Sequence, residues 1–383
     1  MTPLGNDLAT TARAVAGGRR ATVLETPFGA GEAAAARVTG LDARPHFRFP
    51  KALKLADERT RHAVAAASMA WRDAALAAGA FDPARAGVLV GTSGSDLRAE
   101  DLARALADDP ELRAASDVPE FAARILGGLN PLWLLLNLPN MVSAHLAIQL
   151  GLKGPNNTVM TDWCAGLQAL AEAARLVRED EADVVIAGGA ESGTLPFVFG
   201  SYRAAGLFSA GTPAEPAEPF LFGDAAALFV VEERAHAEAR GARVLAEIAG
   251  SGSSASVDED GAGAFSEHGS AAGALARAAG AALAEAGWDA EDVEAVTAAA
   301  PPVAAFRAAE AAALERVFGS RAAAVAIPSA APRLGFALAA AAPVELALLL
   351  HSPAAANVTR ALAISLGFLG QGACLAVQME REA

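Results

Sequence analysis

The spacing of apolar and polar positions predicts a chain in which strands and helices alternate. Helix-period patterns cover residues 60–78 and 165–177, and in the second pattern leucines recur among alanines, which indicates a buried helix of small cross-section. A Gly-, Ser- and Asp-rich stretch at 250–263 predicts an exposed loop between two halves. Apolar runs typical of buried strands occur at 88–90, 184–186 and 228–231.

Two long apolar segments have to be weighed against a membrane span. Residues 125–152 contain no Lys, Arg, Asp or Glu, which is long enough to cross a bilayer. Pro131, Pro139 and several amide side chains interrupt the segment, however, and lipid would leave those polar groups unsatisfied. Residues 334–350 are interrupted in the same way, by Pro343 and Glu345. We therefore expect both segments to be buried within the protein, with no membrane as a partner.

Composition narrows the class of protein further. The 383 residues are 53% hydrophobic and carry a net charge of −14, and the sequence pI is near 4.9. This acidic balance argues against nucleic acid or an anionic membrane surface as a partner. The 2 cysteines have no paired spacing that would indicate a disulfide framework or a zinc site, and we expect no metal and no cofactor. The first residues show no basic and apolar signal segment, so the expected compartment is the cytoplasm.

A series of motifs occurs in order along nearly the whole chain. The motifs are Val88–Gly94, Asn140–Met141, Gly154–Pro155, Ala182–Glu191, Leu228–Glu233, Glu310–Leu314 and Ser365–Gly370. Together they resemble the β-ketoacyl synthases of the thiolase superfamily. The resemblance implies an α/β chain with the thiolase fold, which has five layers (αβαβα) built from two similar halves. The halves would cover residues 1–249, including a tunnel and dimer-interface segment, and residues 250–383.

The same resemblance identifies four positions at which the family carries its reactive groups. A cysteine thiolate at the start of a buried helix accepts the acyl chain, and two histidines stabilise the charge that develops during decarboxylation. Here Trp163 occupies the cysteine position, Ala299 and Phe336 occupy the histidine positions, and Ala331 occupies the position of the family's lysine. None of these four side chains can attack a carbonyl or donate a proton. The resemblance therefore implies a family member with no intact catalytic residue.

Cys164, one residue after Trp163, is the alternative nucleophile. One step along a helix turns the side chain by about 100°, so Cys164 should point away from the substrate tunnel. It would also lack a histidine to activate it. The commoner role of such a free cysteine is that of a small buried apolar residue.

The apolar stretch before Asn140 is where we expect the remaining function. In the family this stretch lines the floor of the acyl tunnel and contributes to the subunit interface, so bulky side chains there would limit the length of the growing chain. Ordinary packing is the alternative for each residue taken singly. The candidate tunnel and interface residues are Trp133, Leu135, Leu136, Asn137, Leu138 and Met141.

A ketosynthase-like chain without its nucleophile most resembles the chain-length factor, the β subunit of type II polyketide and polyene systems. The resemblance implies a heterodimer with a catalytic ketosynthase, in which this chain shapes the acyl tunnel and sets product length. Acyl carrier proteins are acidic, so we expect them to dock mainly on the catalytic partner. Two alternatives stay open: a decarboxylase of malonyl carrier protein or a ketosynthase that uses Cys164, and a homodimeric acyl-binding or scaffold protein.

The family normally begins with a strand before the Thr-Pro-Leu-Gly motif, whereas this sequence has Met1 directly before that motif. Either the first strand is missing, which would leave an edge in a core sheet, or the start was assigned too late.

Overall fold

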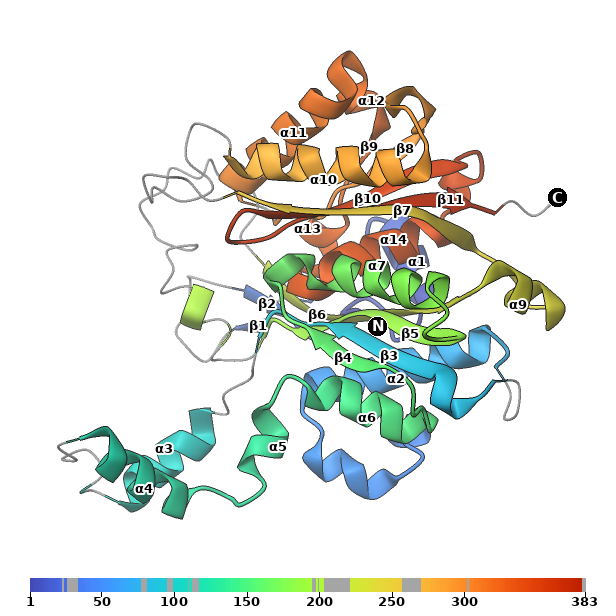
Figure 1. The fold of residues 1–383 in the computed structure, drawn as a ribbon. Helices are drawn as coiled ribbons and strands as arrows, with labels where there is room; N and C mark the ends of the chain where they lie inside the picture. Colours follow the sequence, from blue (N-terminus) through green and yellow to red (C-terminus); the bar gives the residue numbers. More distant parts are fainter. Residues whose placement is uncertain are drawn as a thin grey trace.

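The computed structural model describes residues 1–22, 24–25, 34–76, 81–94, 99–109, 111, 117–194, 198, 200–202, 221–256, 270–301 and 303–380. Two sheets lie roughly parallel to each other, with helices between them and on both outer faces (Figure 1). These five layers are the architecture that the sequence predicts.

The first sheet has six strands in the order β1-β2-β6-β5-β3-β4. β5, β3 and β4 run parallel, and β6 is antiparallel to β5. Every residue of β3 and β5 is buried, as expected for strands covered by helices on both faces. The strands are β1 (Leu24–Glu25), β2 (Ala34–Ala36), β3 (Ala86–Gly91), β4 (Asn156–Val159), β5 (Val184–Ser192) and β6 (Leu221–Glu232).

Residues from the N-terminal part of the chain lie along the edge of β6 that faces away from β5. β2 pairs with the first residues of that edge. Farther along it, Met1 exchanges two backbone hydrogen bonds with Ala226, at 3.0 and 3.1 Å.

The second sheet has five strands in the order β7-β11-β10-β8-β9. β10 pairs with β11 in antiparallel orientation along its whole length, and β8 runs parallel to β10. The strands are β7 (Ala246–Ala255), β8 (Ala295–Thr297), β9 (Ala326–Ile327), β10 (Arg360–Leu366) and β11 (Gln371–Met379).

The loop predicted at 250–263 is wrong for its first part, because residues 250–255 belong to β7. The glycines there serve helix packing: a Cβ at Gly250 would lie 2.3 Å from the Ala282 carbonyl oxygen, and one at Gly252 would lie 1.9 Å from that of Ala278. Both carbonyls belong to α10 (Ser270–Ala286), so the small residues let this helix lie directly on the strand. Residues 257–263 lie outside the described residues.

The helices form the other three layers (Figure 1). α10 and α11 (Ala304–Phe318) cover the outer face of the second sheet, and α2 (Glu58–Asp73) and α6 (Met141–Leu150) cover the outer face of the first. Between the sheets lie α7 (Ala165–Arg178), which confirms the helix predicted at 165–177, and α14 (Ala341–His351). The helix predicted at 60–78 is α2, which starts two residues earlier, where Asp57 caps it by accepting the Thr60 N–H, and ends at Asp73. Other short helices among the described residues are α1 (Leu8–Ala16), α9 (Arg234–Ala239), α12 (Ala322–Val325) and α13 (Ala331–Leu334).

Three helices extend away from the layers as an arm (Figure 1). They are α3 (Ala99–Asp108), α4 (Val118–Gly128) and α5 (Trp133–Asn137), and α5 leads directly into α6. The apolar segment 125–152 is therefore divided among α4, α5 and α6. In the described part of the chain, no helix is long and apolar enough to cross a membrane.

Candidate functional site

Trp163 lies in the short 3-10 turn Asp162–Cys164, immediately before α7 in the layer between the sheets. Its side chain is 1% exposed, and its indole N–H donates to the Tyr202 hydroxyl at 2.9 Å. The rings of Phe336, Phe306, Phe368 and Tyr202 surround it, with centroids at 4.9, 5.0, 5.6 and 5.7 Å. We call these five residues the aromatic cluster. An indole closed in by four rings fills the volume at the predicted nucleophile position.

The other three substituted positions lie in the same hydrophobic core as Trp163. Ala299, Ala331 and Phe336 are 3%, 5% and 1% exposed. The Ala299 and Ala300 backbone N–H groups both donate to one carboxylate oxygen of Glu310, at 3.1 and 2.9 Å. The structure thus brings the four predicted positions into one packed core that contains only apolar side chains at those positions.

A small cavity lies beside one of these positions. It is lined by Ala331, Gly335, Glu345 and Asp224 and has a volume of about 10 Å³. That is about the minimum for a single water molecule. An acyl chain could enter here only if the surrounding side chains moved.

Cys164 points away from the aromatic cluster, as its position one step along the turn predicts. Its side chain is fully buried, and its Sγ lies 3.4 Å from the Ser365 carbonyl oxygen and 3.5 Å from that of Gln371. Burial raises the pKa of the Cys164 thiol to about 12, so no thiolate is available near neutral pH. Cys374 is also buried, and burial raises its pKa as well. Neither cysteine has the environment of a nucleophile.

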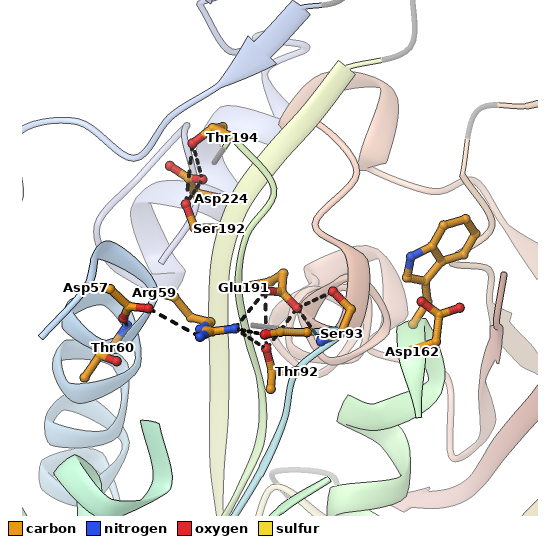
Figure 2. Close-up of polar contacts among 12 residues, drawn as sticks. Asp57, Arg59, Thr60, Thr92, Ser93, Asp162, Glu191, Ser192, Thr194 and Asp224 are labelled. Carbon is orange, nitrogen blue, oxygen red and sulfur yellow. Dashed lines mark hydrogen bonds and ion pairs between the residues drawn. The ribbon is translucent and has the colours of Figure 1, made fainter. Parts of the chain in front are cut away.

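Sequence reasoning missed a buried ionic network beside the first sheet, which Figure 2 shows. Arg59 of α2 is 2% exposed, and its guanidinium lies 3.6 Å from the Glu191 carboxylate at the end of β5 and 3.3 Å from Asp57. It also donates to the Thr92 hydroxyl at 2.9 Å. Glu191 accepts further hydrogen bonds from the Ser93 amide and hydroxyl, at 2.6 and 2.7 Å. These bonds tie the start of α2 to the ends of β3 and β5. Thr92, Ser93 and Glu191 belong to the sequence motifs, but the sequence does not connect them with Arg59.

Asp162 is the second group that sequence reasoning missed, and it lies apart from the Arg59 network in Figure 2. Its backbone is left-handed (φ 58°), a conformation that Asp tolerates better than most residues. One carboxylate oxygen accepts the Phe368 N–H, and the other accepts the Tyr202 hydroxyl at 3.2 Å. Burial raises the pKa of Asp162 to about 6, although hydrogen bonds from the Phe368 and Trp163 amides and from Tyr202 favour its charged form.

Two buried carboxyl groups lie near the substituted positions. Burial raises the pKa of Glu310 and of Glu345 to about 7, and the hydrogen bonds they accept only partly oppose that rise. Glu345 accepts the Ser329 hydroxyl at 2.6 Å and the Ala330 N–H at 2.7 Å. Both carboxylates hold backbone segments in place. Within the described ranges, no group of three or more His, Cys, Asp or Glu residues could hold a metal ion.

The six candidate tunnel and interface residues lie elsewhere, on α5, at the start of α6 and, for Leu138, in the connection between them. Leu136 and Asn137 are buried, Leu138 is 40% exposed, and Trp133, Leu135 and Met141 are half-buried. None of the six belongs to the core that surrounds Trp163, as far as the described residues show. The structure therefore separates the substituted catalytic positions from the segment predicted to limit chain length.

Comparisons with known proteins agree with this geometry. The Beta-ketoacyl synthase N-terminal domain matches residues 2–237, and the Beta-ketoacyl synthase C-terminal domain matches residues 245–359. A 3-oxoacyl-[acyl-carrier-protein] synthase 2 from Vibrio cholerae serotype O1 is 28% identical over 281 residues. That alignment covers 69% of this chain and 64% of the relative's length.

Two solved structures resemble the chain along almost its whole length. The first is the ishigamide ketosynthase/chain length factor, with a TM-score of 0.78 and 23% sequence identity. The alignment covers 99% of this chain and 96% of the matched chain. A type II PKS acyl-carrier protein in complex with its ketosynthase has a TM-score of 0.73 and 21% identity, and covers 99% of this chain and 97% of the matched chain.

Two stacked sheets in five layers, with α7 starting between them at the substituted position, define a thiolase-fold protein. Within that class, the chain belongs to the β-ketoacyl synthase family.

Proposed function

We propose that this chain is the non-catalytic subunit of a ketosynthase heterodimer and acts as its chain-length factor. The observation that supports this proposal most directly is the aromatic cluster, because it fills the nucleophile position with a buried indole. Ala299 and Phe336 supply no ring nitrogen for decarboxylation, which disfavours a decarboxylase. A thiol as buried as Cys164 disfavours a shifted nucleophile.

A surface suited to a subunit partner lies beside α5, α6 and β4. β4 is an end strand of its sheet, and among the described strands it pairs with β3 alone, so its other edge has no partner strand. On that edge the Thr158 N–H donates to the Asn157 side-chain oxygen at 2.8 Å. Met160, directly after β4, is 49% exposed, and Ile148 of α6 is 51% exposed. Leu134 of α5 and Leu138 are 55% and 40% exposed. Exposed apolar side chains beside a free strand edge mark a protein interface. A catalytic ketosynthase is the partner that fits the proposal.

The same position would let α5 shape the partner's tunnel. Trp133, Leu135 and Met141 are half-buried next to the exposed residues, so their side chains lie at the boundary between this chain's core and the proposed interface. A bulky group at that boundary would stop an acyl chain that grows from the partner's cysteine.

Native mass spectrometry tests the subunit assignment, with this chain co-expressed with a ketosynthase that is encoded next to it in the genome. We expect a one-to-one complex in which all acylation is on the partner. Leu134→Asp and Met160→Asp should each break the complex, because each places a charge on the apolar surface. Leu8→Asp is the matched control, since Leu8 is 39% exposed on α1, outside this surface. A homodimer that ignores the ketosynthase would favour the scaffold alternative, and acylation of this chain would refute a non-catalytic role.

Product analysis of the reconstituted complex tests the chain-length role. Trp133→Ala and Met141→Ala should lengthen the product by one or more extension units, because each removes volume at the proposed tunnel end. Trp288→Ala is the control, since Trp288 is a half-buried Trp that contacts Arg360 on the second-sheet side. Unchanged products from both tunnel variants would reject these positions as length-setting.

The carrier protein is proposed to dock mainly on the catalytic partner, because this chain's net charge is −14. Lys51 and Lys54 are exposed on the 3-10 segment Pro50–Leu55. Two neighbouring positive charges could attract an acidic carrier protein, so these residues provide a stringent test. Charge reversal at both positions should leave the turnover of the complex unchanged. A several-fold rise in KM for the carrier protein would move docking onto this subunit.

A further inference from the structure

The turn between β10 and β11, residues 367–370, contributes Phe368 to the aromatic cluster and is hydrogen-bonded to the Asp162 carboxylate. The Phe368 ring packs 5.6 Å from Trp163 and 6.3 Å from Phe306. The Phe368 N–H donates to Asp162, in the 3-10 turn before α7. Leu369, the next residue, is 66% exposed, so the outer side of the turn faces solvent.

Besides the neighbouring Trp163 amide, and despite the nearby charge of Glu191, hydrogen-bond donors from two other parts of the chain converge on the Asp162 carboxylate. The Phe368 amide donates to one oxygen and the Tyr202 hydroxyl to the other. Tyr202 is oriented for this role because its oxygen accepts the indole N–H of Trp163 at 2.9 Å. An amide and a hydroxyl that converge on one carboxylate have the arrangement of a site for a small anion.

We propose that the Phe368 amide and the Tyr202 hydroxyl form a carboxylate-binding site that the chain occupies with its own Asp162. This internal ligand holds the 367–370 turn closed over the aromatic cluster. The inference goes beyond the subunit role, since it assigns Asp162 the task of keeping this chain's own pocket shut. Without the Asp162 side chain, the site should accept a small free carboxylate such as formate.

Hydrogen–deuterium exchange of the Phe368 amide, followed by mass spectrometry at pH 7, tests the proposal. In the Asp162→Gly variant the carboxylate is removed, and glycine accommodates the φ of 58° without strain. A hydrogen bond to a charged group is strong enough that its loss should speed exchange about 10- to 100-fold. Added sodium formate should restore protection, whereas sodium chloride at the same ionic strength should not.

Asp180→Gly is the matched control, because Asp180 has the same φ of 58° and its side chain is 92% exposed beside Arg85. In the Asp180→Gly variant, the Phe368 amide should exchange at the same rate as in the unmodified chain. If Asp162→Gly leaves the Phe368 amide fully protected, the carboxylate does not hold the turn. If exchange speeds up but formate has no effect, the donors do not form an anion site.

Asp162→Asn provides a second variant if the glycine variant does not fold. Asn keeps an acceptor oxygen and tolerates the left-handed backbone, but it removes the charge. Intermediate exchange is expected, and exchange equal to that of the unmodified chain would overturn the role of the charge.

Discussion

Replacing Trp163 by alanine tests whether the indole is a structural filling or a movable gate. An aromatic side chain buries about 150–250 Å². At about 25 cal/mol per Å² its removal would lose roughly 4–6 kcal/mol. Partial collapse of the surrounding rings lowers that figure, and Trp→Ala changes in cores cost about 3–5 kcal/mol. Because Trp163 is 1% exposed and contacts four rings, we expect a loss of about 4 kcal/mol in the free energy of unfolding.

Urea unfolding followed by far-UV circular dichroism measures this loss. Trp163→Phe is the graded control, since it keeps one ring in place while losing the hydrogen bond to Tyr202 and part of the buried indole volume, and it should therefore cost less than the alanine change. Free indole should raise the stability of the alanine variant by binding in the apolar space left behind. A loss below about 1 kcal/mol, with no response to indole, would show that the position is loosely packed. The view that this chain's own pocket is filled would then be refuted.

Three further outcomes follow from the buried polar groups and the cysteines. Cys164 and Cys374 should not react with Ellman's reagent in the folded protein at pH 8 and should both react in guanidinium, because burial raises both pKa values; a fast thiol in the folded protein would contradict this. Burial raises the pKa of Glu345 to about 7 in the folded protein, so this group's contribution to stability is fully present below about pH 4.5 and is lost as the pH rises through 7. Glu345→Gln should remove this contribution, which is about 3 kcal/mol at most, and an unchanged pH profile of urea unfolding would exclude Glu345 as a source of it. Arg59→Met should cost about 3–5 kcal/mol because it leaves Glu191 buried without its cation. Adding Glu191→Gln should recover most of that loss, and no recovery in the same unfolding assay would mean that packing, not charge, sets the cost.

Much of the fold could be predicted from the sequence because its signals are local. The apolar runs that became β3 and β5 are continuous, as in strands covered on both faces, and α7 begins at the predicted residue. β7 was missed because its glycines and serines are typical of loops. What places a strand there is the close approach of α10, a contact that local composition does not show.

In the candidate site, too, some residues could be predicted from the sequence and others only from the folded structure. The four positions were predicted from the family resemblance, and the structure places them in one core, although that placement does not itself test their assignment as catalytic positions. Asp162, Tyr202 and Arg59 carried no local signal. Asp162 meets Phe368 206 positions later in the sequence, so only the folded chain shows that the two are hydrogen-bonded.

The free edge of β4, with exposed Met160 beside it, also matters while the protein is being made. An unpaired strand edge next to apolar side chains is a template for any extended chain that reaches it. A partner that is already folded when this chain leaves the ribosome would cover the edge at once. A surplus copy would present it to other copies of itself and to the proteases that remove orphan subunits, so the supply of the partner would set how much of this protein persists.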